Sequence, residues 1–129
     1  MLDLNKVHKY NKKISILEKE LKLKRKEIDM INITYGEIKS KIINSLAEEK
    51  ALKIVELEEE LKDLKAKRDK AIVEVREIIN KLEDENLIKL MELRYVDCLK
   101  WEDIAEIMGY SDKHIFYVRN KALKKIYKK

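Results

Sequence analysis

The feature that most constrains the fold of this chain is a heptad repeat of core-type residues in its middle. The repeat alternates spacings of three and four without a slip through Ile54, Leu57, Leu61, Leu64, Arg68, Ala71, Val75, Ile78 and Leu82. Such a repeat places its side chains on one stripe of a helix, and that stripe packs against another helix. The segment therefore predicts a long coiled-coil helix.

A second heptad repeat precedes the first and supplies a partner for it. Its members are Ile14, Leu17, Leu21, Lys24, Ile28 and Ile31. Between the repeats, Thr34-Tyr35-Gly36 is the expected break, and Ser45 stands three residues before Glu48, the spacing of a capping box. We expect an antiparallel hairpin in which helix 3–31 packs on part of helix 46–83, with a linker near 32–44. Residues 1–83 would form a helical coiled-coil arm that leaves part of its seam for a second chain.

One member of the first repeat, Arg68, is charged. A buried charge costs several kcal/mol unless it is paired, so a charge at a core position favours one specific register. Arg68 either pairs with an acidic residue across the seam or extends to its rim. The sequence leaves both alternatives open.

Composition supports an all-α fold with long elements. The chain of 129 residues has no proline and two glycines, and 43% of its residues are charged, far above the ~25% of typical globular domains. Its single cysteine, Cys98, excludes an internal disulfide framework. No apolar run approaches the ~20 residues of a membrane span. We therefore expect a cytoplasmic protein that makes no membrane contact.

The segment from Trp101 to Val118 has the residue order of a helix-turn-helix. A small residue, Ala105, stands where two crossing helices approach closely, and Gly109 stands at the turn. A positive φ is expected at Gly109, because glycine adopts it without steric cost. Ser111 follows as a helix N-cap. A preceding helix over about 86–98 would complete a three-helix domain at 84–129, burying Leu87, Leu90 or Met91, Leu93 and Tyr95.

The helix after Ser111 has one apolar and one polar face. Ile115, Val118, Ala122 and Ile126 keep helical spacing and are expected to be buried. The opposite face carries Lys113, Tyr117, Asn120 and Lys124, flanked by His114, Phe116 and Lys121. Cations interleaved with amide and aromatic groups suit the DNA major groove. The alternative is a lysine-rich face that is only solvated.

Charge is segregated along the chain, whose formal net charge is +5. Residues 5–26 carry nine Lys or Arg against two Glu, and residues 111–129 carry seven against one Asp. Basic segments of this kind favour polyanionic partners, although the first also fits a solvated coiled-coil face. The two histidines, His8 and His114, have no metal-ligand partners at helical spacing, and there are too few glycines for a phosphate-binding loop. We expect no enzymatic activity, no metal and no cofactor.

The segment LMELRYVDCLKWEDIAEIMGYSDKHIFYVRNKALKKI resembles region four of bacterial sigma factors. The resemblance covers residues 87–127 and rests on Arg94-Tyr95, on Trp101-Glu102-Asp103-Ile104-Ala105 and on the tail from Lys121 to Ile126. More narrowly, the layout is similar to small sigma-region-four-like proteins of phages and prophages, including ArpU-type regulators. These also place a helical region and an Ile-Thr-Tyr-type linker, here Ile33-Thr34-Tyr35, before the helix-turn-helix.

The resemblance implies particular site residues. By position, base reading would fall on Asp112, Lys113, Phe116 and Tyr117, and phosphate contacts near Lys100 and Lys121. Sigma proteins tend to have polar residues where this chain has Phe116 and Tyr117, so their promoter sequence does not transfer. The other sigma regions are not found in this sequence, so we expect no autonomous promoter melting.

Together, the residues and the resemblance predict a sequence-specific, DNA-binding phage regulator of transcription. The expected base-reading residues are Asp112, Lys113, Phe116, Tyr117 and Asn120. The expected phosphate contacts are Lys100, Ser111, His114, Lys121 and Lys124. Double-stranded DNA is the expected partner, and the arm is expected to form a homodimer. Two alternatives are an adaptor that docks on RNA polymerase and a DNA-packaging adaptor similar to small terminase subunits.

Overall fold

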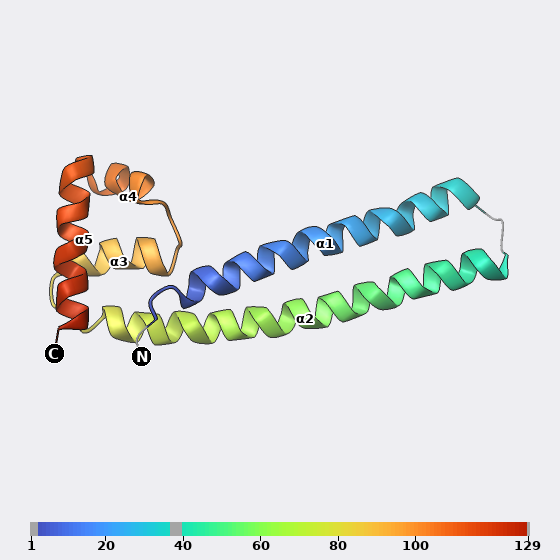
Figure 1. Ribbon diagram of the computed structural model, residues 1–129, viewed down its shortest axis with the longest axis horizontal. Helices are drawn as coiled ribbons and strands as arrows, with labels where there is room; N and C mark the ends of the chain where they lie inside the picture. Colours follow the sequence, from blue (N-terminus) through green and yellow to red (C-terminus); the bar gives the residue numbers. More distant parts are fainter. Residues whose placement is uncertain (1–2, 37–39, 129) are drawn as a thin grey trace. The chain divides into compact units, whose positions relative to one another are not determined.

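The computed structural model describes residues 3–36 and 40–128, and within them it is all-helical, without a strand (Figure 1). The expectation of an all-α fold is confirmed. The helices are α1 (Lys6–Tyr35), α2 (Lys41–Ile79), α3 (Glu85–Tyr95), α4 (Trp101–Met108) and α5 (Asp112–Tyr127). None of these helices combines the length and the apolar character that crossing a membrane requires.

The contacts divide the described chain into two compact units. The hairpin unit comprises residues 10–67, and the C-terminal unit comprises residues 3–9 together with 68–128. Both α1 and α2 therefore contribute to each unit.

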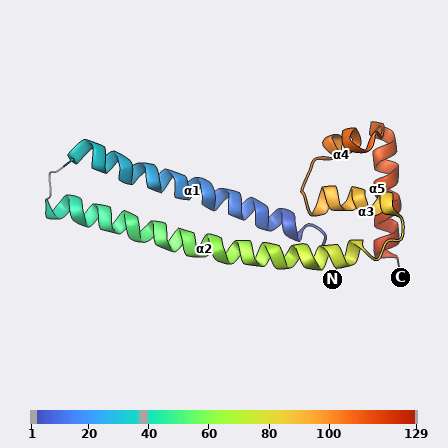
Figure 2. The ribbon, with the colours of Figure 1, turned by 180° about the vertical axis from the view of Figure 1, so that it is seen from behind.

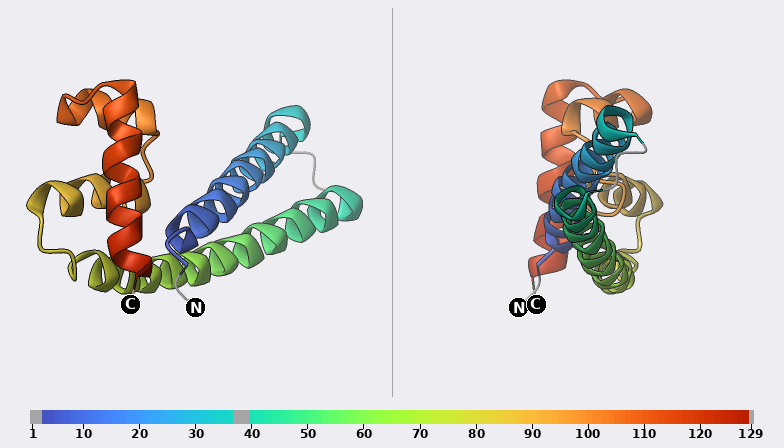
Figure 3. Two further views of the ribbon diagram at one scale, coloured as in Figure 1. Left: turned by 60° about the vertical axis from the view of Figure 1, so that its left-hand side comes forward. Right: turned by 90° about the vertical axis from the view of Figure 1, so that its right-hand side faces the viewer.

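In the hairpin unit, α1 and α2 run antiparallel and side by side (Figure 3). Leu17 and Leu21 of α1 pack with Leu57 of α2, and Ile54, Leu61 and Leu64 cover this cluster. These are members of the two heptad repeats, so the repeats do face each other here. Ion pairs join the helices on either side, with 3.2 Å from Arg25 Nη2 to Glu58 Oε1 and 2.6 Å from Lys50 Nζ to Glu27 Oε2.

The predicted helix ends in this region were wrong. Helix α1 begins at Lys6 and continues through Tyr35, so Thr34 and Tyr35 are helical and only Gly36, at φ +53°, leaves the helix. Helix α2 begins at Lys41 and not near residue 46, because the Ser40 hydroxyl accepts a hydrogen bond from the Ile43 N–H at 3.2 Å. Of the expected linker 32–44, residues 37–39 lie outside the described residues.

Helix α2 also ends earlier than the predicted residue 83. It stops at Ile79, and Leu82 is buried just beyond that end. Arg68 forms no ion pair across the seam with a described residue, and its guanidinium extends to the exposed Asp69, which fits the second alternative. Its side chain is 29% exposed, and its guanidinium contacts Asp69, the next residue on the same helix, at 3.0 Å.

The C-terminal unit is built around α3, α4 and α5, each of which contacts the other two (Figure 2). Helix α3 buries all the residues expected of it, Leu87, Leu90, Met91, Leu93 and Tyr95, although it ends at Tyr95 and not at residue 98. Its N-cap is Asp84, whose carboxylate accepts hydrogen bonds from the Asn86 and Leu87 N–H groups. The negative charge at this position also suits the positive end of the helix dipole.

The start of the chain belongs to the same unit, which the sequence did not reveal. Leu4 and Val7 are almost completely buried. The His8 ring nitrogen Nε2 lies 2.9 Å from the Arg94 carbonyl oxygen, and Lys6 Nζ lies 3.0 Å from Glu74 Oε2. The segment is therefore held by apolar burial and by polar contacts to α2 and α3.

Candidate nucleic-acid interface

The turn between α4 and α5 has the backbone geometry predicted from Gly109. This glycine has φ +71° and ψ +29°, in the left-handed region. The Tyr110 N–H donates to the Ala105 carbonyl at 2.8 Å and the Gly109 N–H donates to the Glu106 carbonyl at 3.3 Å. Together these two bonds make a Schellman motif, which satisfies carbonyls left open at a helix end. Ala105 is buried, as a close approach of helices requires.

The N-terminus of α5 is capped as predicted. The Ser111 hydroxyl accepts a hydrogen bond from the His114 N–H at 3.1 Å, and Asp112 lies in the first turn. An N-cap bond uses one lone pair and leaves the hydroxyl hydrogen available for donation. Ser111 can thus cap the helix and still donate to a phosphate oxygen.

Helix α5 presents one buried face and one exposed face. Ile115, Val118 and Ala122 are buried and Ile126 is half-buried. All five predicted base-reading residues, Asp112, Lys113, Phe116, Tyr117 and Asn120, are exposed. Phe116 and Tyr117 are 45% and 64% exposed, so both rings present part of their surface to solvent.

The predicted phosphate-binding residues are also exposed, and they come from two helices. Ser111, His114, Lys121 and Lys124 lie on α5 or at its start, whereas Lys100 is the N-cap residue of α4. None of the three lysines forms an ion pair with any described residue. Their charges are therefore not neutralised within the described part of the chain.

Three rings gather at the start of α5. The His114 ring meets Tyr110 edge-on, with centroids 4.8 Å apart, and stacks on Tyr117 at 5.9 Å with an angle of 25° between the planes. A T-shaped and a stacked contact are both favourable arrangements of rings. These contacts restrict the rotamers of His114 and Tyr117, two predicted site residues.

A second cluster, which sequence reasoning missed, surrounds Trp101. The guanidinium carbons of Arg94 and Arg119 lie 5.2 Å and 5.6 Å from the Trp101 ring centroid, and Arg119 also lies 4.9 Å from the Phe116 ring. Cation–π contacts of this kind fix the arginine side chains against α4 and α5. The nearest sequence signal is the spacing of three between Phe116 and Arg119, which puts them on one side of a helix.

Arg119 also contacts a predicted base-reading residue. Its Nε and Nη2 atoms donate to the Asn120 Oδ1 atom at 3.3 Å and 3.1 Å. This amide oxygen therefore already accepts hydrogen bonds, while the amide NH₂ group has no partner among the described residues. Asn120 is better placed to donate to a base than to accept from one.

The connection from α3 to α4 brings Trp101 and Lys100 into place. Arg94 Nη1 donates to the Leu99 carbonyl at 2.9 Å, and Cys98 adopts a positive φ of 60°, which the sequence did not predict. The Cys98 thiol lies 3.6 Å from the Val96 carbonyl. Tyr95 packs edge-on against Trp101, and its burial raises the pKa of the Tyr95 hydroxyl above its usual value of 10.0.

Within the described residues there is no group of three or more His, Cys, Asp or Glu side chains suited to hold a metal ion. Comparisons of the chain with protein-family models, with curated proteins and with solved structures found no match.

Proposed function

We propose that this chain is a sequence-specific DNA-binding protein of phage origin that regulates transcription. The observation that carries the proposal is the exposed face of α5, which joins unneutralised lysines, exposed aromatic rings and an amide on one helix. This face lies opposite the buried Ile115, Val118 and Ala122. The helix that carries it follows a left-handed turn at Gly109 and is capped at its start by Ser111. Side chains on such a face can contact base edges and phosphates together.

The proposed roles divide the face by chemistry. Lys113, Tyr117 and Asn120 would donate to base edges, Phe116 would make apolar contacts, and Asp112 would accept from a base amino group. Lys121 and Lys124 would bind phosphates, as would Ser111, His114 and Lys100 at the edges of the face. We add Arg119 as a positioning residue, because it contacts both Phe116 and Asn120.

The hairpin is the proposed coiled-coil arm of the regulator and its site of dimerisation. Exposed apolar side chains on α1 and α2, such as Leu23 and Ile42, support this role. Cytoplasmic, nucleoid-associated localisation is part of the same proposal, since regulation of transcription requires access to DNA.

The test compares two classes of substitution on a cognate site selected from random DNA. Lys124→Ala should weaken binding to every sequence. It should also lower the salt slope, which is the slope of the logarithm of the binding constant against the logarithm of the salt concentration, by roughly one unit. Tyr117→Ala and Asn120→Ala should each cost about 1–3 kcal/mol on the cognate site and little on random DNA.

The matched control is Lys89→Ala, an exposed lysine of α3, which should leave binding and salt slope unchanged. If all three α5 variants lose equal affinity for cognate and random DNA, the exposed face of α5 binds DNA only through its charge and does not read sequence. That result would favour the RNA polymerase-docking alternative instead.

A further inference from the structure

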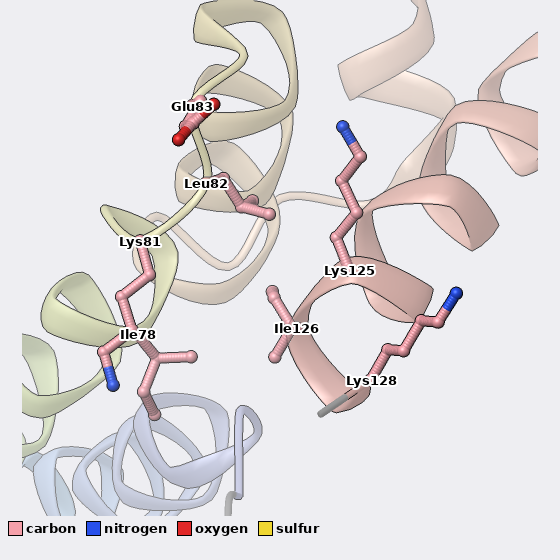
Figure 4. Close-up of a pocket in the computed structure, with 7 residues that line it drawn as sticks. All are labelled: Ile78, Lys81, Leu82, Glu83, Lys125, Ile126 and Lys128. Carbon is pink, nitrogen blue, oxygen red and sulfur yellow. The ribbon is translucent and has the colours of Figure 1, made fainter.

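A cavity of about 370 Å³ lies in the C-terminal unit, where the end of α2 meets the end of α5. It is lined by Ile78, Lys81, Leu82, Glu83, Lys125, Ile126 and Lys128. The Leu82 and Ile126 side chains point toward each other across it (Figure 4). Its size is at the lower end of the range for ligand pockets, so it can accept a few aliphatic side chains.

The rim of this cavity is basic. Lys81, Lys125 and Lys128 are exposed, and none of them forms an ion pair with a described residue. Their amino groups point apart rather than converging (Figure 4). A single anionic headgroup could not meet all three. The rim instead suits an extended ligand whose carboxylates flank apolar groups.

The chain itself contains such a surface, on the solvent side of α2. Residues 48–63 carry seven acidic side chains against three lysines. Within them, Glu48, Leu52, Val55 and Glu59 follow spacings of four, three and four, and so share one face of the helix. We call these four residues the acidic stripe. Leu52 and Val55 are 62% and 49% exposed, and Glu48 and Glu59 form no ion pair with a described residue.

We propose that the acidic stripe of one copy of this chain docks in the basic cavity of a second copy. Leu52 and Val55 enter the cavity, and Glu48 and Glu59 meet the lysines of its rim. The occupant belongs to another copy because Ile78, which lines the cavity, and the acidic stripe are parts of one continuous helix, α2. Each residue of a continuous helix adds about 1.5 Å along its axis, so the stripe is separated from Ile78 of its own chain by several helical turns. When each copy fills the cavity of the other, the pairing closes as a dimer with two-fold symmetry.

This contact differs from pairing of the arms along their heptad seam, and it does not rest on DNA binding. It uses residues of α5 other than those assigned to DNA, so a failure of one proposal leaves the other standing. Because opposite charges meet at an exposed rim, the association should weaken as ionic strength rises.

The experiment measures molar mass by light scattering and sedimentation over a range of protein concentrations. The double variant Lys125→Glu/Lys128→Glu and the double variant Glu48→Lys/Glu59→Lys should each weaken self-association by about tenfold or more. An equimolar mixture of the two variants should restore it, because opposite charges meet again. The matched control, Lys113→Glu/Lys121→Glu, reverses two charges elsewhere on α5 and should associate like the wild type.

Circular dichroism checks that each variant remains folded, and Lys125→Gln/Lys128→Gln replaces the first variant if charge reversal unfolds it. A wild type that is monomeric at every concentration would overturn the proposal. So would an oligomer that neither double variant weakens, which would place the contact on another surface. Two weakened variants whose mixture stays dissociated would also overturn it, since the two surfaces would then not be partners.

Discussion

The two units of this chain bury their apolar side chains to very different extents. In the hairpin unit only Ile14, Leu17, Leu21 and Leu57 are buried among the described residues, whereas Ile33 and Ile42 are 76% and 81% exposed. The C-terminal unit surrounds Leu90, Met91, Ile104 and Ile115 almost completely. Since burial of apolar area is the main source of stability, we expect the C-terminal unit to be the more stable of the two.

The difference has a functional counterpart. The proposed DNA contacts require a rigidly held helix, because misplaced side chains lose their base contacts. Helix α5 has a buried face, a Schellman motif before it and a serine N-cap at its start. A two-helix hairpin has too little interior to bury all its apolar residues. The proposed self-association of the arm would bury some of these exposed apolar positions.

The largest expected effect tests the core of the C-terminal unit. Leu90→Ala should lower the free energy of unfolding by about 2–5 kcal/mol, because the side chain is fully enclosed and its removal leaves a cavity. Leu57→Ala in the hairpin should cost roughly 1.5–3 kcal/mol, since its partly exposed neighbours can close the gap. Urea unfolding of both variants measures the difference, and a larger loss for Leu57→Ala would reverse the comparison.

A smaller effect is expected at the two glycines with positive φ. Gly109 joins packed helices, whereas Gly36 ends α1 in the hairpin, and a Cβ would meet no atom within 4 Å at either position. Any cost is therefore backbone strain alone. Gly109→Val should destabilise the C-terminal unit by about 1–3 kcal/mol.

Gly36→Val is the matched substitution, and it should cost less because the end of α1 carries no buried side chain beyond Leu21 and can adjust. Thermal unfolding measures both variants. Equal losses would mean that the hairpin end is held as firmly as the turn before α5.

These two glycines also mark what the sequence could and could not predict. Gly109, Ser111 and the buried residues of α3 and α5 were predictable, because helical spacing and turn chemistry are local. The start of α2 was not, since Ser40 and Ser45 are both residues of a type that caps helices. The contact of His8 with Arg94 joins residues 86 positions apart, and no local pattern encodes it. The Trp101 cluster was missed because Arg94, Trp101 and Arg119 lie on three different helices, so helical spacing encodes only its Phe116–Arg119 contact.

The smallest expected effect concerns acid, and it compares one ion pair in each unit. A hydrogen bond from Lys6 lowers the pKa of Glu74 in the C-terminal unit, and one from Lys50 lowers the pKa of Glu27 in the hairpin, both from an ordinary value of 4.5. A carboxyl group whose pKa is lower when folded adds stability above its unfolded pKa. That stability is lost as the pH falls below 4.5 and through the lowered value.

Titration of the two carboxyl groups by NMR measures this directly. Both midpoints should lie below 4.5 in the wild type. Lys6→Met should return only the Glu74 midpoint toward its ordinary value, and Lys50→Met should mainly return that of Glu27, where Lys24 still acts. Because both pairs remain partly open to solvent, the accompanying change in stability should be slight. The contrary result is a Glu74 midpoint that stays fixed in Lys6→Met while the Glu27 midpoint moves in Lys50→Met. It would show that Lys6 does not hold the start of the chain to α2.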